Sequence, residues 1–163
     1  MAARLGRPLV TVSCHDDLAA ADLVGRHLIV DGQTLWHDGP MARAVREMSK
    51  LGEAVGGQRD TFSGLAGMGD LIVTCTSQRS RNRHVGEQLG SGKSVEEIIA
   101  SMNQVAEGVK AASVIMEFAE KYGLNMPIAR EVDAVISHGA TVEQAYRGLA
   151  AEKPGHEVEG SGF

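Results

Sequence analysis

The sequence predicts a mainly α-helical domain over residues 41–152, preceded by a short atypical segment (residues 1–40) and followed by a flexible tail (residues 153–163). Two observations predict the helices. Apolar residues recur at three- and four-residue steps, and residues that favour helix ends flank those segments. The composition is 43% apolar and 23% charged over 163 residues, which suits one soluble domain with its own core.

Residues 1–40 differ from the rest because they contain β-prone runs and turns. The runs are residues 8–13 and 27–30, and residues 18–24 are expected to form a short helix between them. Asp31-Gly32 and Asp38-Gly39-Pro40 are turn signals. No strand in this segment leads into a Gly-x-Gly-x-x-Gly loop, so these residues do not make a complete dinucleotide-binding domain.

The first helix of the main domain is predicted to begin near Met41 and to end at Gly56-Gly57. Its apolar residues fall on one face. We assign Arg43, Glu47 and Lys50 to the opposite, polar face.

The middle of the chain contains two predicted helix caps and one apolar run of ambiguous conformation. Asp60 is expected to cap a short helix over Thr61–Ala66. Leu71–Thr76 fits either a strand or a buried helical turn, because a short apolar run does not distinguish the two. Ser80 is predicted to be the N-cap of a helix that runs to Leu89.

The same signals predict the remaining helices. These are Val95–Met102 behind a Ser94–Glu97 capping box, Glu107–Tyr122 ending at Gly123, a helix from Pro127 to Gly139, and a last one opened by Thr141.

Composition and charge exclude several kinds of function. The net charge of −5 argues against general nucleic-acid binding. No apolar run approaches the roughly 18 residues of a membrane span, and no signal peptide is recognisable. The two cysteines, Cys14 and Cys75, show no metal-ligand spacing and allow one disulfide at most, so a cytoplasmic location is expected. No zinc site, paired carboxylates or Ser-His-Asp arrangement stands out, and His84 and His138 are interpreted as ordinary histidines.

The candidate site is the run from Gly64 to Arg83, which combines three closely spaced glycines, a single carboxylate and an arginine-rich helix start. If Ser80 is an N-cap, the N–H groups of the next three residues are free to meet a phosphate beside the arginine side chains. The alternative is a solvated helix start with a structural cap. From the pattern alone, the two interpretations are balanced.

Two acidic residues have both a structural and a functional interpretation. Asp70 is expected to be partly buried, where it accepts a hydrogen bond from a substrate hydroxyl or caps the next helix. Glu107 opens a helix after a turn. Its pattern alone favours a capping role.

The run from Gly64 to Arg83 closely resembles the substrate-domain signature of bacterial NAD(P)-dependent glycerol-3-phosphate dehydrogenases. The likeness continues in residues 47–52, 105–108 and 125–128, and it covers about residues 41–152. It implies a helical domain like the C-terminal domain of 6-phosphogluconate dehydrogenase. It also implies the reaction of the family, which interconverts glycerol 3-phosphate and dihydroxyacetone phosphate and feeds phospholipid synthesis.

The resemblance assigns roles to individual residues. It implies that Asp70, Ser80, Arg81 and Asn82 contact the phosphorylated substrate. It further implies that Arg81 approaches NAD or NADP, together with two residues near the start of a later helix, Val105 and Glu107. A homodimer is a possible assembly.

The sequence departs from the family in two respects. The Rossmann domain with its glycine-rich loop does not precede this region, and no Lys-Asn motif supplies the catalytic lysine of the family. Residues 1–40 match nothing in the family, which fits a frameshift, a wrong start site or a replaced region. We therefore expect the chain to be inactive alone. The alternative function is a non-catalytic helical module that binds phosphorylated small molecules or dimerises.

Overall fold

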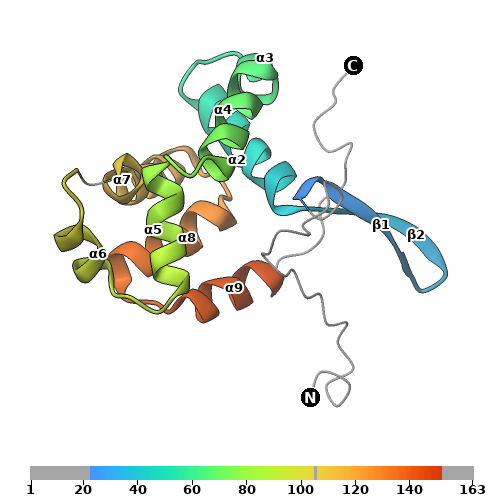
Figure 1. Ribbon diagram of the computed structural model, residues 1–163. Helices are drawn as coiled ribbons and strands as arrows, with labels where there is room; N and C mark the ends of the chain where they lie inside the picture. The colour runs from blue at the N-terminus through green and yellow to red at the C-terminus, as the bar shows by residue number, and fades with distance from the viewer. Residues whose placement is uncertain (1–22, 105, 152–163) are drawn as a thin grey trace. The chain divides into compact units, whose positions relative to one another are not determined.

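A computed structural model describes residues 23–104 and 106–151 (Figure 1). The chain divides into two compact units: one spans residues 44–152, and the other includes the residues up to 43. Each unit is described by itself. The tail predicted over residues 153–163 and the run predicted over residues 8–13 lie outside the described residues, as does most of the helix predicted over residues 18–24.

The smaller unit contains an antiparallel hairpin of β1 (Gly25–Val30) and β2 (Gln33–Asp38), in which Leu28 lies opposite Leu35. The connection is the predicted Asp31-Gly32 turn. Both of its residues have positive φ values, 51° and 78°. An Asp-Gly pair suits such a turn because it matches the twist of the two strands. The β-prone run at residues 27–30 is therefore confirmed as part of a strand.

The larger unit is helical, as predicted. Its helices are α2 (Pro40–Ala54), which begins in the smaller unit, α3 (Arg59–Ser63), α4 (Leu65–Thr76), α5 (Arg81–Gly90), α6 (Val95–Ser101), α7 (Glu107–Tyr122), α8 (Pro127–His138) and α9 (Val142–Ala151). Successive helices pack on one another, with α7 against α8 and α8 against α9 (Figure 1). A small core joins α5 and α6 to the start of α7 through Val85, Ile98 and Ala106.

Helix ends that depend on nearby residues are confirmed. Ser94 accepts a hydrogen bond from the N–H of Glu97, and the Glu97 side chain accepts one from the N–H of Ser94. Gly123 and Gly139 end α7 and α8 in the left-handed conformation, with φ values of 64° and 70°. Glycine suits both positions because a Cβ atom disfavours a positive φ.

The prediction around Asp60 is wrong. Helix α3 begins at Arg59, follows Gln58 without a side-chain cap, and ends at Ser63, so Asp60 lies in its first turn. A separate helix, α4, begins at Leu65. The ambiguous segment Leu71–Thr76 is the second half of that helix, which settles its conformation as helical.

Two glycines of the Gly64–Arg83 run allow backbone segments to approach closely. A Cβ atom on Gly64 would lie 2.4 Å from the carbonyl oxygen of Asp60, and one on Gly67 would lie 2.1 Å from that of Phe62. Both distances are far below van der Waals contact. These glycines are explained by the packing of α3 against α4, whereas a Cβ on Gly69 would meet nothing within 4 Å.

Glu47 was assigned to the polar face of the first helix, and this assignment is wrong: the residue is only 7% exposed. Its carboxylate accepts hydrogen bonds from the N–H groups of Ile128 at 2.7 Å and Ala129 at 3.0 Å. Both N–H groups belong to the first turn of α8, which has no side-chain cap of its own at Met126. Glu47 therefore caps α8 from α2 and connects two helices far apart in the sequence.

Burial raises the pKa of Glu47 above its usual value of 4.5, and the two backbone hydrogen bonds, Lys50 and Arg130 offset part of this effect. The ionised carboxylate is the better acceptor for two N–H groups, but it is also the form that loses most hydration on burial. The folded protein therefore holds the proton of the Glu47 carboxyl more tightly than the unfolded chain does.

We predict that Glu47→Ala lowers the free energy of unfolding by about 1–3 kcal/mol, because it leaves two N–H groups of α8 without their acceptor. Urea unfolding followed by circular dichroism measures the change. Glu53→Ala is the matched control, since Glu53 lies on the same helix and is exposed. Equal effects of the two substitutions would contradict the capping role.

The pKa of Glu47 generates a second prediction. Because the folded-state pKa is raised, ionisation costs stability as pH rises from about 4.5 through that pKa. The unfolding free energy of the wild type minus that of Glu47→Gln should therefore decrease over this window and then level off. Urea unfolding at a series of pH values gives this difference. A difference that grows with pH would mean that the hydrogen bonds outweigh burial.

Candidate functional site

The start of α5 holds the predicted phosphate-binding groups. Ser80 is the N-cap, as expected, and its Oγ accepts a hydrogen bond of 3.2 Å from the N–H of Arg83. This bond removes one of the three N–H groups expected to be free. Within the described part of the chain, the N–H groups of Arg81 and Asn82 have no protein acceptor, so they are available to an anion.

The guanidinium of Arg83 is already bound within the domain. Its Nε donates to Glu87 at 2.7 Å, and its Nη1 donates to the carbonyl of Thr76. These contacts connect the end of α4 to α5. The arginines of this segment therefore differ in role. The guanidinium of Arg83 is structural, whereas that of Arg81 is exposed.

Two side chains at the start of α5 reach the residues around the start of α7. Oδ1 of Asn82 accepts a hydrogen bond of 3.1 Å from the N–H of Gly108, and Nη1 of Arg81 donates to Oε1 of Gln104 at 2.7 Å. A Cβ atom on Gly108 would lie 2.8 Å from the same oxygen of Asn82, so glycine permits this approach. The structure thus brings together residues that are more than 20 positions apart.

Glu107 is the first residue of α7 and is exposed. It is the acidic residue in the first turn of that helix, which fits the structural role favoured by its sequence pattern, and the N-cap Ala106 makes no side-chain hydrogen bond. The N–H of its neighbour Gly108 donates a hydrogen bond to Oδ1 of Asn82. Val105 lies outside the described residues.

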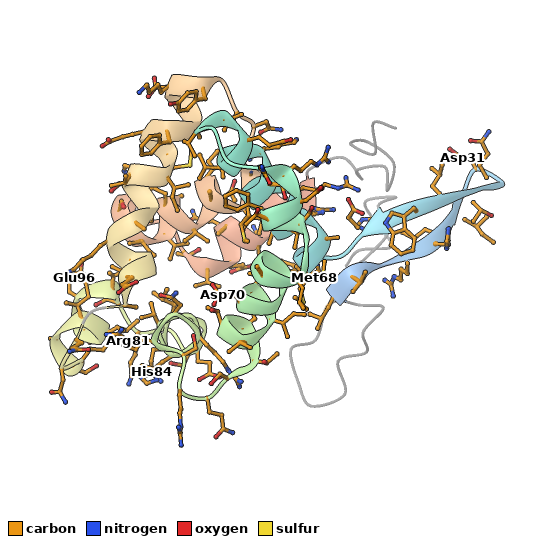
Figure 2. The ribbon with its side chains drawn as sticks, turned by 90° about the horizontal axis from the view of Figure 1, so that it is seen from above. Asp31, Met68, Asp70, Arg81, His84 and Glu96 are labelled. Carbon is orange, nitrogen blue, oxygen red and sulfur yellow. The ribbon has the colours of Figure 1, made fainter. Side chains whose placement is uncertain are left out.

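Asp70 differs from its prediction in two ways. It is exposed rather than partly buried, and it lies inside α4 rather than at the cap of a helix. In Figure 2 its side chain projects from the flank of α4 on the same side as Arg81. No hydrogen bond between described residues occupies its carboxylate, which is therefore able to accept one from a ligand hydroxyl.

The electrostatics of the α5 start favour an anion, whereas the Glu107 carboxylate offsets the positive end of α7. Each N-terminus carries about half a positive charge, and the Arg81 guanidinium adds a full one. Asn82 and Gly108 also line a cavity of about 440 Å³, but its other walls are mostly apolar side chains of α8 and α9. A phosphate keeps its charge, so the solvent-facing side of the helix starts suits it better than this cavity.

Gln104 was missed by the sequence interpretation. No local pattern marks it, because its role depends on Arg81, which lies 23 positions earlier. The histidines are ordinary, as expected: His138 contacts Asp133 at 3.1 Å on α8, and His84 is exposed.

The described residues lack two other features. No group of three or more His, Cys, Asp or Glu side chains is arranged to hold a metal ion. Among the same residues, no helix has the length and apolar character needed to cross a bilayer.

Comparison with known proteins identifies relatives of this chain. The chain is 82% identical over 123 residues to a glycerol-3-phosphate dehydrogenase (NAD(P)+) of Mycobacterium avium, covering 76% of this chain and 36% of that protein. The corresponding Mycobacterium tuberculosis protein, numbered 1, is 80% identical over the same length and coverage. The chain therefore spans about a third of the length of these relatives.

A solved structure and a family model agree with these matches. The crystal structure of glycerol-3-phosphate dehydrogenase from Coxiella burnetii superposes with a TM-score of 0.65 at 33% identity, covering 69% of this chain and 34% of that one. The family model described as the C-terminus of NAD-dependent glycerol-3-phosphate dehydrogenase matches residues 37–147. The chain therefore belongs to the NAD-dependent glycerol-3-phosphate dehydrogenase family, through the C-terminal domain of that family.

Proposed function

We propose that residues 41–152 are the substrate-binding domain of an NAD(P)-dependent glycerol-3-phosphate dehydrogenase, with residues 1–40 as a separate segment and residues 153–163 as a tail. The observation that supports this most directly is the pair of hydrogen bonds that the N–H of Gly108 donates to Asn82 and the guanidinium of Arg81 donates to Gln104. They join the residues that the resemblance assigns to substrate with the segment that it assigns to the cofactor.

In this proposal the substrate is glycerol 3-phosphate or dihydroxyacetone phosphate. Its phosphate accepts hydrogen bonds from the N–H groups of Arg81 and Asn82 and from the Arg81 guanidinium. Ser80 orders these groups by capping the helix, and its hydroxyl lies at the edge of the same site. Asp70 accepts a hydrogen bond from a substrate hydroxyl, which distinguishes a phosphorylated polyol from phosphate alone.

The cofactor in this proposal is NAD or NADP, which exchanges a hydride with the substrate carbon when it is bound. The residues present fit part of such a group. The exposed Arg81 guanidinium suits a phosphate or amide oxygen, while Val105 and Glu107 belong to the segment that Gln104 and Gly108 connect to α5. Arg81 thus fixes the relative position of substrate and cofactor.

Turnover needs further groups. Hydride transfer requires a complete cofactor site and a group that moves the hydroxyl proton, and the Lys-Asn motif of the family does not occur in the sequence. We propose that this chain binds substrate without turning it over alone. For the complete enzyme we propose a cytoplasmic role in supplying phospholipid synthesis, with a homodimer as the assembly.

The alternative is a non-catalytic helical module that binds phosphorylated small molecules or dimerises, and the N–H groups of Arg81 and Asn82 favour it because they can bind any anion. The selectivity of ligand binding distinguishes the substrate domain from the general module. A substrate domain prefers glycerol 3-phosphate to inorganic phosphate because Asp70 recognises a hydroxyl, whereas a general phosphate module binds both equally.

We predict that Arg81→Ala weakens binding of glycerol 3-phosphate by about 10- to 100-fold, since a charge-assisted hydrogen bond is worth about 1.5–3 kcal/mol. Isothermal titration calorimetry of the purified chain measures the affinity. Arg79→Ala is the control, because Arg79 has the same charge and is exposed in the loop just before the cap.

This experiment also includes inorganic phosphate as a second ligand. Equal losses for the two arginine variants would indicate a diffuse basic field, and equal wild-type affinity for both ligands would favour the general module. NAD(P)H formation from glycerol 3-phosphate by the wild-type chain alone would contradict the proposed lack of turnover.

Asn82 is predicted to act in both folding and binding, and two substitutions separate these effects. Asn82→Ala removes the acceptor of the Gly108 N–H and should lower the unfolding free energy by about 1 kcal/mol. Asn82→Asp keeps that acceptor and adds a negative charge at two helix starts, so stability is retained while binding of glycerol 3-phosphate is weakened. Thermal unfolding and calorimetry give the two readouts. Unchanged binding by Asn82→Asp would argue against a phosphate at this position.

A further inference from the structure

An apolar cavity of about 440 Å³ is lined by residues of α5, α7, α8 and α9, and we call it the α5–α9 cavity. Small-molecule pockets have volumes of about 300–1,000 Å³, so its size suits a small ligand. Its walls include Val85 and Leu89 of α5, Val109 of α7, Val135 of α8 and Ala145 of α9. Asn82 and Gly108 belong to the same walls, so the cavity adjoins the candidate substrate site.

The α5 residues that line the cavity follow one face of the helix. Spacings of three and four residues put them on the same side: Asn82, Val85, Gly86 and Leu89. With a rise of about 1.5 Å per residue, the face from Asn82 to Leu89 is about 10 Å long. The cavity therefore extends along α5 from the phosphate-binding groups at the start of that helix.

Gly86 leaves room in the α5 side of the wall. It lies in the interior of α5, where glycine is disfavoured relative to alanine. A Cβ atom here would meet nothing within 4 Å among the described residues, whereas one on Gly108 would lie 2.8 Å from Oδ1 of Asn82. Packing thus accounts for the glycine at 108 but not for the one at 86. Without a side chain at Gly86, the cavity is wider.

The cavity has an apolar rim that reaches solvent. Val132 of α8 and Val142 of α9 line it, and they are 45% and 42% exposed. An apolar ligand that enters the cavity removes such surfaces from water, and this burial favours binding. The interior therefore suits an aliphatic group.

The charges around the cavity determine which end of a ligand enters it. Glu131 brings a carboxylate into the wall, which lies 3.3 Å from Nε of Arg130 and 2.6 Å from where a Cβ atom on Gly148 would be. A phosphate inside the cavity would meet this negative charge. At the start of α5 it meets the N–H groups of Arg81 and Asn82 instead. A ligand with a phosphate and an apolar chain therefore places the chain inside.

We propose that the α5–α9 cavity binds the aliphatic chain of a phosphate monoester whose phosphate lies at the start of α5. The ligand class is an amphiphile with a phosphate headgroup and one aliphatic chain, to which aliphatic esters of glycerol 3-phosphate belong. Both kinds of ligand need the same phosphate site, so such an amphiphile competes with glycerol 3-phosphate. The inference rests on the proposed function, because it uses the phosphate site assigned there.

The test is a calorimetric titration of the 163-residue chain with methyl, butyl and octyl phosphate. These probes share one headgroup and differ in chain length. Each methylene that the cavity buries should raise the affinity about threefold. Octyl phosphate should therefore bind at least tenfold more tightly than methyl phosphate, and it should displace glycerol 3-phosphate.

Gly86→Leu fills the cavity from α5 and should weaken octyl phosphate binding at least tenfold while methyl phosphate binding is unchanged. Gly90→Leu is the matched control, because Gly90 lies on the same helix, outside the cavity wall, and has equally open space around its Cβ position. Circular dichroism shows whether the variants keep their helices. Gly86→Ala adds only a methyl group and should give a smaller loss, so it serves if Gly86→Leu does not fold.

Three results would overturn the inference. The first is equal affinity for the three probes, and the second is an equal loss of octyl phosphate binding in Gly86→Leu and Gly90→Leu. The third is binding that begins only where octyl phosphate forms micelles, because the probe would then act as a detergent.

Arg81→Ala keeps the inference and the proposed function distinguishable. It should weaken methyl and octyl phosphate by the same factor as glycerol 3-phosphate. If glycerol 3-phosphate binds through Arg81 but affinity does not depend on chain length, only the cavity inference fails. If Gly86→Leu weakens octyl phosphate binding but Arg81→Ala affects no ligand, the proposed phosphate site fails and the cavity binds the chain alone.

Discussion

The hydrogen bond between Oδ1 of Asn82 and the N–H of Gly108 holds the start of α7 against the start of α5, and the geometry of the candidate site depends on it. Without an acceptor at this position, α7 would begin with an unsatisfied donor, because Ala106 is its N-cap and offers no side-chain acceptor. The same contact places two positive helix ends next to each other. One amide side chain thus contributes both to folding and to the attraction of an anion.

Polar contacts between helices help to position the helices of this domain. Ile98 is the largest side chain among the described residues that is fully buried, so the apolar core is small. Glu47 connects α2 to α8, and Arg83 connects α4 to α5. Such contacts depend on direction as well as distance, and they therefore fix helix ends more sharply than apolar contact does.

Most of the fold could be predicted from the sequence because its signals are local. The caps at Ser80 and Ser94 and the stops at Gly123 and Gly139 involve residues within a few positions of each other. Asp60 shows the limit of such signals, since an acidic residue in the first turn resembles a cap without being one.

Contacts between distant residues could not be predicted. The spacing of Glu47 assigned it to the polar face of α2, and only the position of α8 explains why a carboxylate is buried there. The candidate site shows the same division. The groups of the α5 start were predicted from the Ser80 cap, whereas Gln104 and the partner of Asn82 depend on how α7 packs. Asp70 is exposed on α4, although its place before an apolar run suggested partial burial.

In the proposed function, the start of α5 binds the phosphate of a phosphorylated polyol, next to the start of α7. The most direct measurement is a titration of the ¹⁵N-labelled chain with glycerol 3-phosphate, followed through its backbone amide resonances. We expect the N–H groups of Arg81 and Asn82 to shift most, with a smaller shift at Gly108. Saturable shifts elsewhere in the chain, with these three resonances unmoved, would contradict the account.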